Sequence, residues 1–241
     1  MLALVLGIAL ASPCEVTLDI RPVRQKGGRC LAAATSTALS ARGGSVTPAM
    51  LAPALPLSRL GEDPFDLQEA LQPLGWDTLV FEGSFDQGSR LVEAGFAPLL
   101  FIEDGGTPHA VVLAGVRRRQ TPDGRCLGAA DHVALLDPRV GAIEWTPTAA
   151  IQRHDDHARM LVSFETTARS ALDDAGFDLK AATRSDRRYR AESLIARAQA
   201  RNAPDAESIA LLERAAMADP TWSEPRRLLT IHKQALIDPP P

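Results

Sequence analysis

Hydrophobic and polar positions predict a helix-rich first half of the chain. Alternating residues at 15–20 predict a short edge strand, and the alanine-rich run that starts at Cys30 predicts a helix to about Arg42, where Gly43 and Gly44 supply a stop signal. Proline and leucine are frequent in the next thirty or so residues. The further elements expected there are helices beginning near Thr47 and Asp63, a strand at 77–81 and an amphipathic helix at 85–94.

The middle of the chain changes to strand patterns separated by turn residues. A nearly continuous apolar strand at 98–102 is followed by a glycine-rich turn and a second strand at 109–116. A charged hairpin with Pro122-Asp123-Gly124 at its tip follows. The remaining strands are expected at 132–136, 141–145 and 159–164. A helical half followed by an antiparallel sheet half predicts an α+β domain over residues 15–165.

The last quarter of the chain returns to helical periodicity. A polar segment at 166–185 is expected to link the α+β domain to a helical tail at 186–241, with helices at 186–200, 205–218 and 224–236. The alanine placement and the passage 216–225 resemble a tetratricopeptide helical hairpin with a following helix. About one and a half repeats are fewer than the three usually needed for an independent array. Two interpretations of the tail stay open: a helical cap packed on the main domain, and a peptide-docking module.

Cys30 has the sequence setting of a reactive thiol. A flexible Gly27-Gly28 pair precedes it, and the predicted helix begins at the cysteine itself. The unpaired N–H groups and the dipole at a helix N-terminus favour the thiolate over the thiol. Gln25 lies a few residues upstream, where its side-chain amide and the Cys30 backbone N–H could form an oxyanion hole.

Two further residues supply the base and its orienter. His109 opens a hydrophobic strand directly after a glycine-rich turn, which places its ring at a strand edge. Asp137 ends a later strand, in an Asp-Pro turn, where it could accept a hydrogen bond from the far nitrogen of the imidazole. The candidate catalytic set is therefore Cys30, His109, Asp137 and Gln25.

The order of these residues is similar to that of papain-like proteins, and more closely resembles the bacteriocin-processing (double-glycine) cysteine peptidases. In that family a Gln precedes a Cys at a helix start, the His opens a run like Pro108–Gly115, and the Asp sits in an Asp-Pro-x-x-Gly turn like Asp137–Gly141. The resemblance covers roughly residues 20–165. It implies a papain-like α+β fold and hydrolysis of peptide bonds in a peptide or protein substrate, with neither cofactor nor metal.

Each of these residues also has a plain structural interpretation. Cys30 could be a small buried apolar residue on an alanine-rich helix, and His109 a strand-edge residue satisfied by the adjacent loop. Asp137 could simply form a turn before Pro138, and Gln25 could be a solvated loop residue. The presence of all four together favours the catalytic interpretation.

Two other groups compete for a chemical role. Cys126, in a hairpin rather than at a helix start, repeats the Gly-Arg-Cys-Leu context of Cys30 and could pair with it in a disulfide. The cluster His154-Asp155-Asp156-His157 resembles a set of metal ligands, but adjacent positions on a loop point in different directions, so a solvated polar turn is favoured over a metal site.

The N-terminus predicts export. Met1–Ala11 is an apolar run too short to span a bilayer, and Ala9-Leu10-Ala11 has the form of a signal-peptidase site, so residues 1–13 are expected to be a bacterial-type signal peptide for a periplasmic or secreted protein. The apolar run could instead be a first buried strand or helix of the domain. Cys14 raises the further alternative of a lipid anchor, although Pro13 makes the site a poor one.

Composition narrows the partners. The chain has 241 residues, 45% of them hydrophobic and 23% charged, with a formal net charge of −4 and a single tyrosine. Neither a basic face for phosphates nor aromatic stacking platforms are expected, which argues against nucleic-acid binding. The sequence thus predicts an exported cysteine peptidase. An inactive peptidase-like scaffold that binds a peptide or envelope protein through its cleft and tail, and a transpeptidase or transglutaminase on the same scaffold, remain as alternatives.

Overall fold

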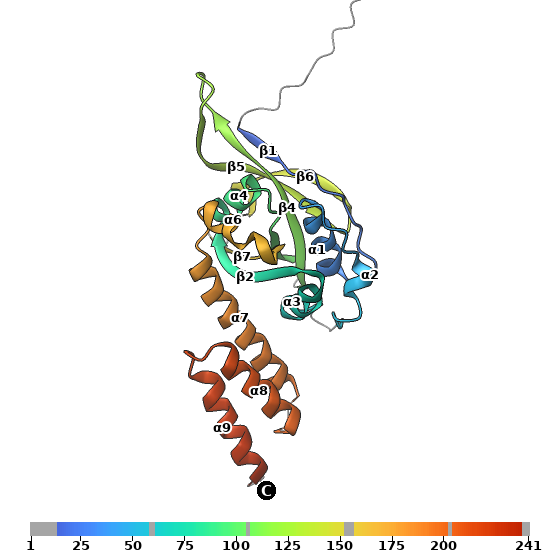
Figure 1. The fold of residues 1–241 in the computed structure, drawn as a ribbon, viewed down its shortest axis with the longest axis vertical. Coiled ribbons are helices and arrows are strands. Elements are labelled where there is room, and N and C mark those ends of the chain that lie inside the picture. Colours follow the sequence, from blue (N-terminus) through green and yellow to red (C-terminus); the bar gives the residue numbers. More distant parts are fainter. Residues whose placement is uncertain (1–13, 58–60, 105–106, 152–156, 202–203, 238–241) are drawn as a thin grey trace, which may run out of the picture.

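The computed structural model describes residues 14–57, 61–104, 107–151, 157–201 and 204–237. These residues form an antiparallel sheet with helices on both faces and a helical arm that extends from one edge (Figure 1). The predicted signal peptide and the cluster at 154–156 lie outside the described residues. Among the residues that are described, no helix has both the length and the apolar character needed to cross a membrane.

Seven strands form the sheet, in the order β2-β7-β3-β4-β5-β6, with β1 paired to β4, and every pairing is antiparallel. The strands are β1 (Glu15–Thr17), β2 (Trp76–Ser84), β3 (Leu99–Asp104), β4 (Thr107–Gln120), β5 (Cys126–Asp137), β6 (Ala142–Pro147) and β7 (His157–Glu165). The α+β class is confirmed. The predicted strands are all present, but the hairpin strands β4 and β5 are longer than expected.

The strands carry two hydrophobic cores because alternate residues face opposite sides of the sheet. On β4, Val112 and Ala114 pack in a cluster with helix α1, whereas Val111 and Leu113 pack in a cluster with helix α4. The first layer contains α1 (Cys30–Ser40), α2 (Pro48–Leu51) and α3 (Pro64–Leu71), and the second contains α4 (Phe85–Glu93) and α6 (Arg169–Asp174) (Figure 1). The sheet is therefore covered on both faces, which explains the long apolar runs in its central strands.

Residues 166–185, where the sequence predicts a polar linker, are mostly helical in the structure. They form the short helix η3 (Thr166–Ala168), α6 and the start of α7 (Leu179–Ala200). Leu172 and Phe177 are buried in the second core. The polar residues of the segment lie on the solvent side of short helices, so its average polarity concealed a buried face.

The tail consists of α7, α8 (Ala206–Ala218) and α9 (Glu224–Ile237), close to the three predicted helices. Its own core joins Ala191, Leu194 and Leu212 with Leu228. The first part of α7 also covers β2, which is an edge strand of the sheet. Asp186 accepts from the Val80 N–H at 2.9 Å, and Ser185 accepts from the Glu82 N–H at 3.3 Å. The packing of α7 on the domain is consistent with the helical-cap interpretation of the tail. The resemblance of the tail to a tetratricopeptide hairpin stays a prediction.

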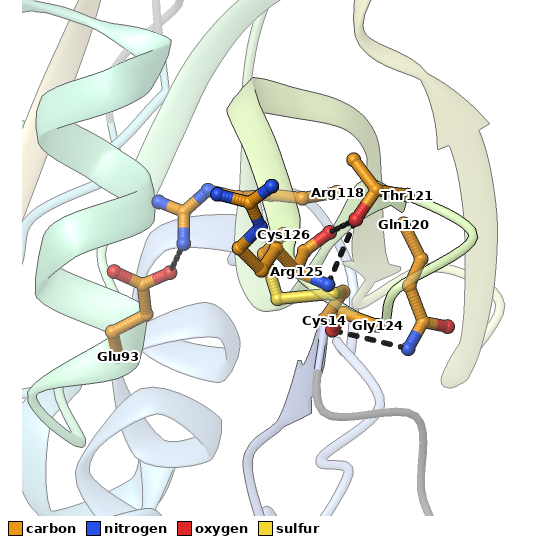
Figure 2. The surroundings of a disulfide bond; sticks show 8 residues. All are labelled: Cys14, Glu93, Arg118, Gln120, Thr121, Gly124, Arg125 and Cys126. Carbon is orange, nitrogen blue, oxygen red and sulfur yellow. Dashed lines mark hydrogen bonds and ion pairs between the residues drawn. A yellow bond between two sulfur atoms is a disulfide. The ribbon is translucent and has the colours of Figure 1, made fainter.

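A disulfide joins Cys14, just before β1, to Cys126 at the start of β5 (Figure 2). The two Cα atoms lie 5.2 Å apart, across 112 residues of sequence. Beside the bond, the Cys14 carbonyl accepts from the Arg118 N–H at 2.8 Å. The alternative pairing of Cys126 with Cys30 is therefore wrong, and Cys30 is a free thiol. A sulfur in a disulfide cannot carry a thioether-linked lipid, so this pairing is also incompatible with an anchor at Cys14.

Candidate active site

Cys30 is the first residue of α1, at the place that the sequence predicts. Gly27 before it has φ +62, a conformation that favours glycine, and the helix that follows is buried from Leu31 to Leu39. The burial fixes α1 against the sheet, and Cys30 itself stays partly exposed at the edge of the first core. A helix held this rigidly gives its first residue a defined position.

His109 and Asp137 meet through the pairing of β4 with β5. His109 lies near the start of β4 and is 6% exposed, and Asp137 is the last residue of β5. The His109 Nε2 and the Asp137 Oδ1 lie 2.9 Å apart. Because Nε2 faces the carboxylate, Nδ1 is the ring nitrogen left for the Cys30 sulfur, to which His109 is hydrogen bonded. The fold thus brings together three of the four candidate residues, although Cys30 and Asp137 are 107 positions apart in the sequence.

The electrostatics of this arrangement favour an ion pair between sulfur and imidazole. Burial opposes ionisation of Cys30, but hydrogen bonds from His109 and from the Ala110 backbone N–H, together with the charge of the imidazolium, lower the pKa of the thiol. The hydrogen bond with Cys30 raises the pKa of His109 against the effect of burial, and the Asp137 carboxylate raises it further. The lowered pKa of Cys30 and the raised pKa of His109 both favour the state in which the proton lies on the imidazole and not on the sulfur.

Asp137 is held by its own turn. Burial is the largest single effect on the pKa of Asp137 and raises it, but several contacts oppose burial. The Arg139 Nη2 lies 2.7 Å from Oδ2, and the Arg139 backbone N–H donates to Oδ1 at 2.8 Å. Together with His109 these contacts lower the pKa of Asp137 to about 2. Gly141 closes the turn with φ +72, and a Cβ there would lie 2.6 Å from the Arg24 side chain. The Asp-Pro-x-x-Gly turn therefore holds the Asp137 carboxylate in place and favours its ionised form.

Gln25 adjoins the site through its backbone. Its N–H donates to the Pro138 carbonyl at 2.9 Å, which joins the loop before Cys30 to the Asp137 turn. The side-chain Nε2 donates to the Gly27 carbonyl at 3.0 Å, and Oε1 is buried without a hydrogen-bond partner. The amide is thus directed into its own loop, and the expected oxyanion role of Gln25 stays a prediction.

The sequence analysis missed Glu62 and Arg29. The Glu62 side chain is fully buried beside the start of α1, with Oε1 at 3.0 Å from the Arg29 Nη1 and Oε2 accepting from the Ala32 N–H at 3.0 Å. Thirty residues separate the carboxylate from this helix start, so no local pattern indicates the contact. The segment that contains Glu62 showed only a cap signal for α3, at Asp63.

A metal site finds no support among the described residues, which hold no group of three or more His, Cys, Asp or Glu side chains placed to bind one. Of the predicted cluster at 154–157, only His157 belongs to a described element, at the start of β7.

Comparisons with known proteins give a distant structural likeness. No family model and no curated protein matches the sequence. Among similar solved structures is a double glycine motif protease from an AMS/PCAT transporter in complex with the leader peptide, with 15% identity, a TM-score of 0.45, and coverage of 63% of this chain and 95% of that one. The peptidase domain of Streptococcus ComA, a bi-functional ABC transporter, has 17% identity and a TM-score of 0.42. The peptidase domain of Streptococcus mutans ComA has 16% identity and a TM-score of 0.36. They match 60% of this chain and 96% and 97% of their own lengths.

Proposed function

We propose that this chain is a cysteine peptidase-like enzyme that hydrolyses an amide bond in a peptide or protein substrate. The observation that supports the proposal is the linked set of side chains: the Cys30 sulfur is hydrogen bonded to His109, whose Nε2 lies 2.9 Å from the Asp137 carboxylate. A nucleophile, a base and a group that orients the base are the parts that covalent catalysis at a carbonyl requires.

The proposed reaction begins with the ion pair. The Cys30 thiolate attacks the substrate carbonyl carbon and forms a carbon–sulfur bond. The electron pair of the carbon–oxygen π bond moves to oxygen, which gives a tetrahedral intermediate with an oxyanion. As this intermediate collapses, the carbon–nitrogen bond breaks and the His109 imidazolium gives its proton to the leaving amine. Water then attacks the thioester while His109 takes one of its protons, and the acid product leaves as Cys30 returns to the thiolate. Asp137 keeps Nε2 in place through both steps.

Charge on the oxyanion needs donors close to the sulfur. The Cys30 backbone N–H lies at the first position of α1, where no carbonyl of the same helix can accept it. The Gln25 amide would be the second donor once its Nε2 turns from the Gly27 carbonyl toward the substrate. Substrate binding in the loop before Cys30 is therefore part of the proposed mechanism.

Export of the protein is a second part of the proposal. The Cys14–Cys126 disulfide would persist in an oxidising compartment, which agrees with the apolar N-terminus and its signal-peptidase pattern. The same disulfide occupies the two other cysteines of the chain, so it leaves Cys30 without an intramolecular partner for oxidation.

The test is the pH dependence of iodoacetamide alkylation, with the labelled cysteine located by mass spectrometry. We expect Cys30 to react with a midpoint well below the ordinary thiol pKa of about 8.5, and His109→Ala to lose this reactivity. A wild-type midpoint near that ordinary value would contradict an activated nucleophile. Peptides with a Gly-Gly sequence are the first substrates to assay, as the family resemblance implies.

The engaged Gln25 amide favours one alternative, a peptidase-like scaffold that binds peptides without cleaving them. In that case Cys30 would alkylate slowly, and a peptide would bind without any acyl-enzyme mass on Cys30. A fast, His109-dependent reaction would exclude this alternative.

A further inference from the structure

The helix that carries Cys30 begins without a cap of its own. Arg29 holds the N-cap position and makes no side-chain cap hydrogen bond. A carboxylate from outside the helix takes over this function, because the Glu62 Oε2 accepts from the Ala32 N–H at 3.0 Å. Ala32 is the third residue of α1, the position whose N–H an N-cap side chain ordinarily satisfies.

The other Glu62 oxygen holds the residue before the nucleophile. Its Oε1 lies 3.0 Å from the Arg29 Nη1, which also donates to the Leu55 carbonyl at 3.0 Å. The carboxylate thus binds the chain on both sides of Cys30, at Arg29 and at Ala32. Its side chain is fully buried, and burying a charge is costly unless the charge is paired and hydrogen bonded, as it is here.

The negative charge of Glu62 does not help to activate the Cys30 thiol. The charged groups that bear on the Cys30 sulfur are His109 on β4 and Glu62 before α3, with Arg29 beside the carboxylate. His109 favours the thiolate, whereas the negative charge of Glu62 raises the pKa of the thiol. A buried group that opposes the thiolate and still contacts both sides of Cys30 is better explained by its geometry.

The segment that carries Glu62 is held in place by contacts with helix α7 of the tail. Asp63 caps α3 by accepting from the Phe65 N–H, and its other oxygen accepts from Ser193 and Arg197 of α7. Arg197 also binds Asp66 in the first turn of α3. Glu62 therefore projects from a segment that α3 and α7 hold in place.

We propose that Glu62 is a positioning residue for the Cys30 nucleophile, because its buried carboxylate caps α1 and binds Arg29 so that the sulfur lies against His109. The inference rests on the proposed function, for which it assigns the group that fixes the nucleophile. Glu62 does not touch the reacting atoms, and it acts through the backbone around Cys30.

Three variants separate its geometry from its charge. Glu62→Gln keeps an amide oxygen for the Ala32 N–H and removes the charge, so the alkylation midpoint of Cys30 should fall by about one pH unit. Arg29→Met leaves the carboxylate without its cation, so the midpoint should rise. Glu62→Ala removes the cap as well, and the midpoint should move toward about 8.5 as the sulfur loses its contact with His109. Glu69→Ala, at an exposed carboxylate of α3, is the matched control and should leave the midpoint unchanged.

Far-UV circular dichroism and thermal unfolding would show which variants fold. If Glu62→Ala does not fold, the opposite shifts of Glu62→Gln and Arg29→Met still carry the test, because general loosening of the site would move both midpoints the same way. Equal shifts in one direction, or a folded Glu62→Ala variant that titrates like the wild type, would overturn the inference. A wild-type midpoint near 8.5 that His109→Ala leaves unchanged would instead contradict the proposed function, while the two opposite shifts still report on Glu62.

Discussion

At the scale of single residues, the site depends on carboxylates with different surroundings. Asp137 lies at the surface of a turn, where Arg139 and His109 keep it ionised, and Glu62 is buried and satisfied by Arg29 and a backbone N–H. In the proposed mechanism, Asp137 orients the base and Glu62 fixes the nucleophile. Neither role follows from residue type, since both depend on which donors the fold brings to the carboxylate.

Replacement of Asp137 by Asn tests the orienting role. The neutral amide removes the charge that raises the pKa of His109, so the ion pair with Cys30 should weaken. We expect iodoacetamide alkylation of Cys30 at pH 6 to fall roughly tenfold, which corresponds to a change of about one unit in pKa. Arg139→Met keeps the carboxylate and its contact with His109 and should have a smaller effect. Equal rates for wild type and Asp137→Asn would show that Asp137 only forms the turn.

The same variant has a pH signature in stability. The folded-state pKa of Asp137, about 2, lies below its ordinary value of 3.8, so its ionised form stabilises the fold above pH 3.8 and this contribution disappears as the pH falls through about 2. The shift corresponds to about 2 kcal/mol. Urea unfolding should therefore show Asp137→Asn to be less stable than the wild type at pH 7, with the difference shrinking toward pH 2.

At the scale of elements, the helix–strand order was predictable and several boundaries were not. The helix at Cys30 was correct because alanines and a Gly-Gly stop are local signals. The extension of β4 through Arg117 to Arg119 was missed because those charged residues are paired with β5 outside the apolar pattern. The helices within residues 166–185 were not predicted, because η3 buries no residue and α6 buries only Leu172, which gives little periodicity.

The candidate catalytic residues were easier to predict than the residues that contact them. Cys30, His109 and Asp137 each lie in a recognisable turn or helix start, and the structure brings these three together. Glu62 contacts Ala32 across thirty residues, and the Gln25 amide turns toward its own loop. Such contacts depend on side-chain packing between distant segments, about which a single sequence carries no local signal.

Helix α7 gives an element-scale prediction at the edge of the sheet. Burial raises the pKa of Asp186, whose Oδ1 accepts from the Val80 N–H at 2.9 Å. A raised pKa means that the protonated form stabilises the fold below pH 3.8, and that this contribution is lost as the pH rises through the folded-state pKa. Asp186→Asn keeps the acceptor without the charge, so we expect a higher melting temperature at pH 7 and no gain at pH 3.

The control for this prediction is Asp186→Ala, which removes the acceptor and leaves the buried Val80 N–H unsatisfied. It should lower the melting temperature at both pH values, by the equivalent of about 1–3 kcal/mol. If Asp186→Asn were less stable than the wild type at pH 7, the ion contacts of Asp186 with Arg190 and Arg187 would outweigh its desolvation.

At the scale of the whole molecule, covalent and ionic links connect the site to both ends of the described chain. On one side, the disulfide fixes β1, which precedes the Gln25–Cys30 loop, to the start of β5 beside the hairpin turn (Figure 2). His109 and Asp137 lie at the opposite end of the same hairpin. On the other, Ser193 and Arg197 of α7 bind Asp63, next to Glu62. The tail thus holds the segment that carries Glu62, and the N-terminal strand is joined covalently to the hairpin that carries His109 and Asp137.

The disulfide yields the last prediction, through the double variant Cys14→Ser with Cys126→Ser. Closing a chain segment of 112 residues restricts the unfolded state, and loss of such a bond typically costs about 2–5 kcal/mol. Denaturant unfolding at neutral pH should show this loss, and dithiothreitol should destabilise the wild type to a similar extent while leaving the variant unchanged. In the native oxidised wild type, a thiol reagent should label Cys30 alone, since the two other cysteines are paired. Labelling of Cys14 or Cys126 without reductant would contradict the pairing, and with it the support that the disulfide gives to an oxidising compartment.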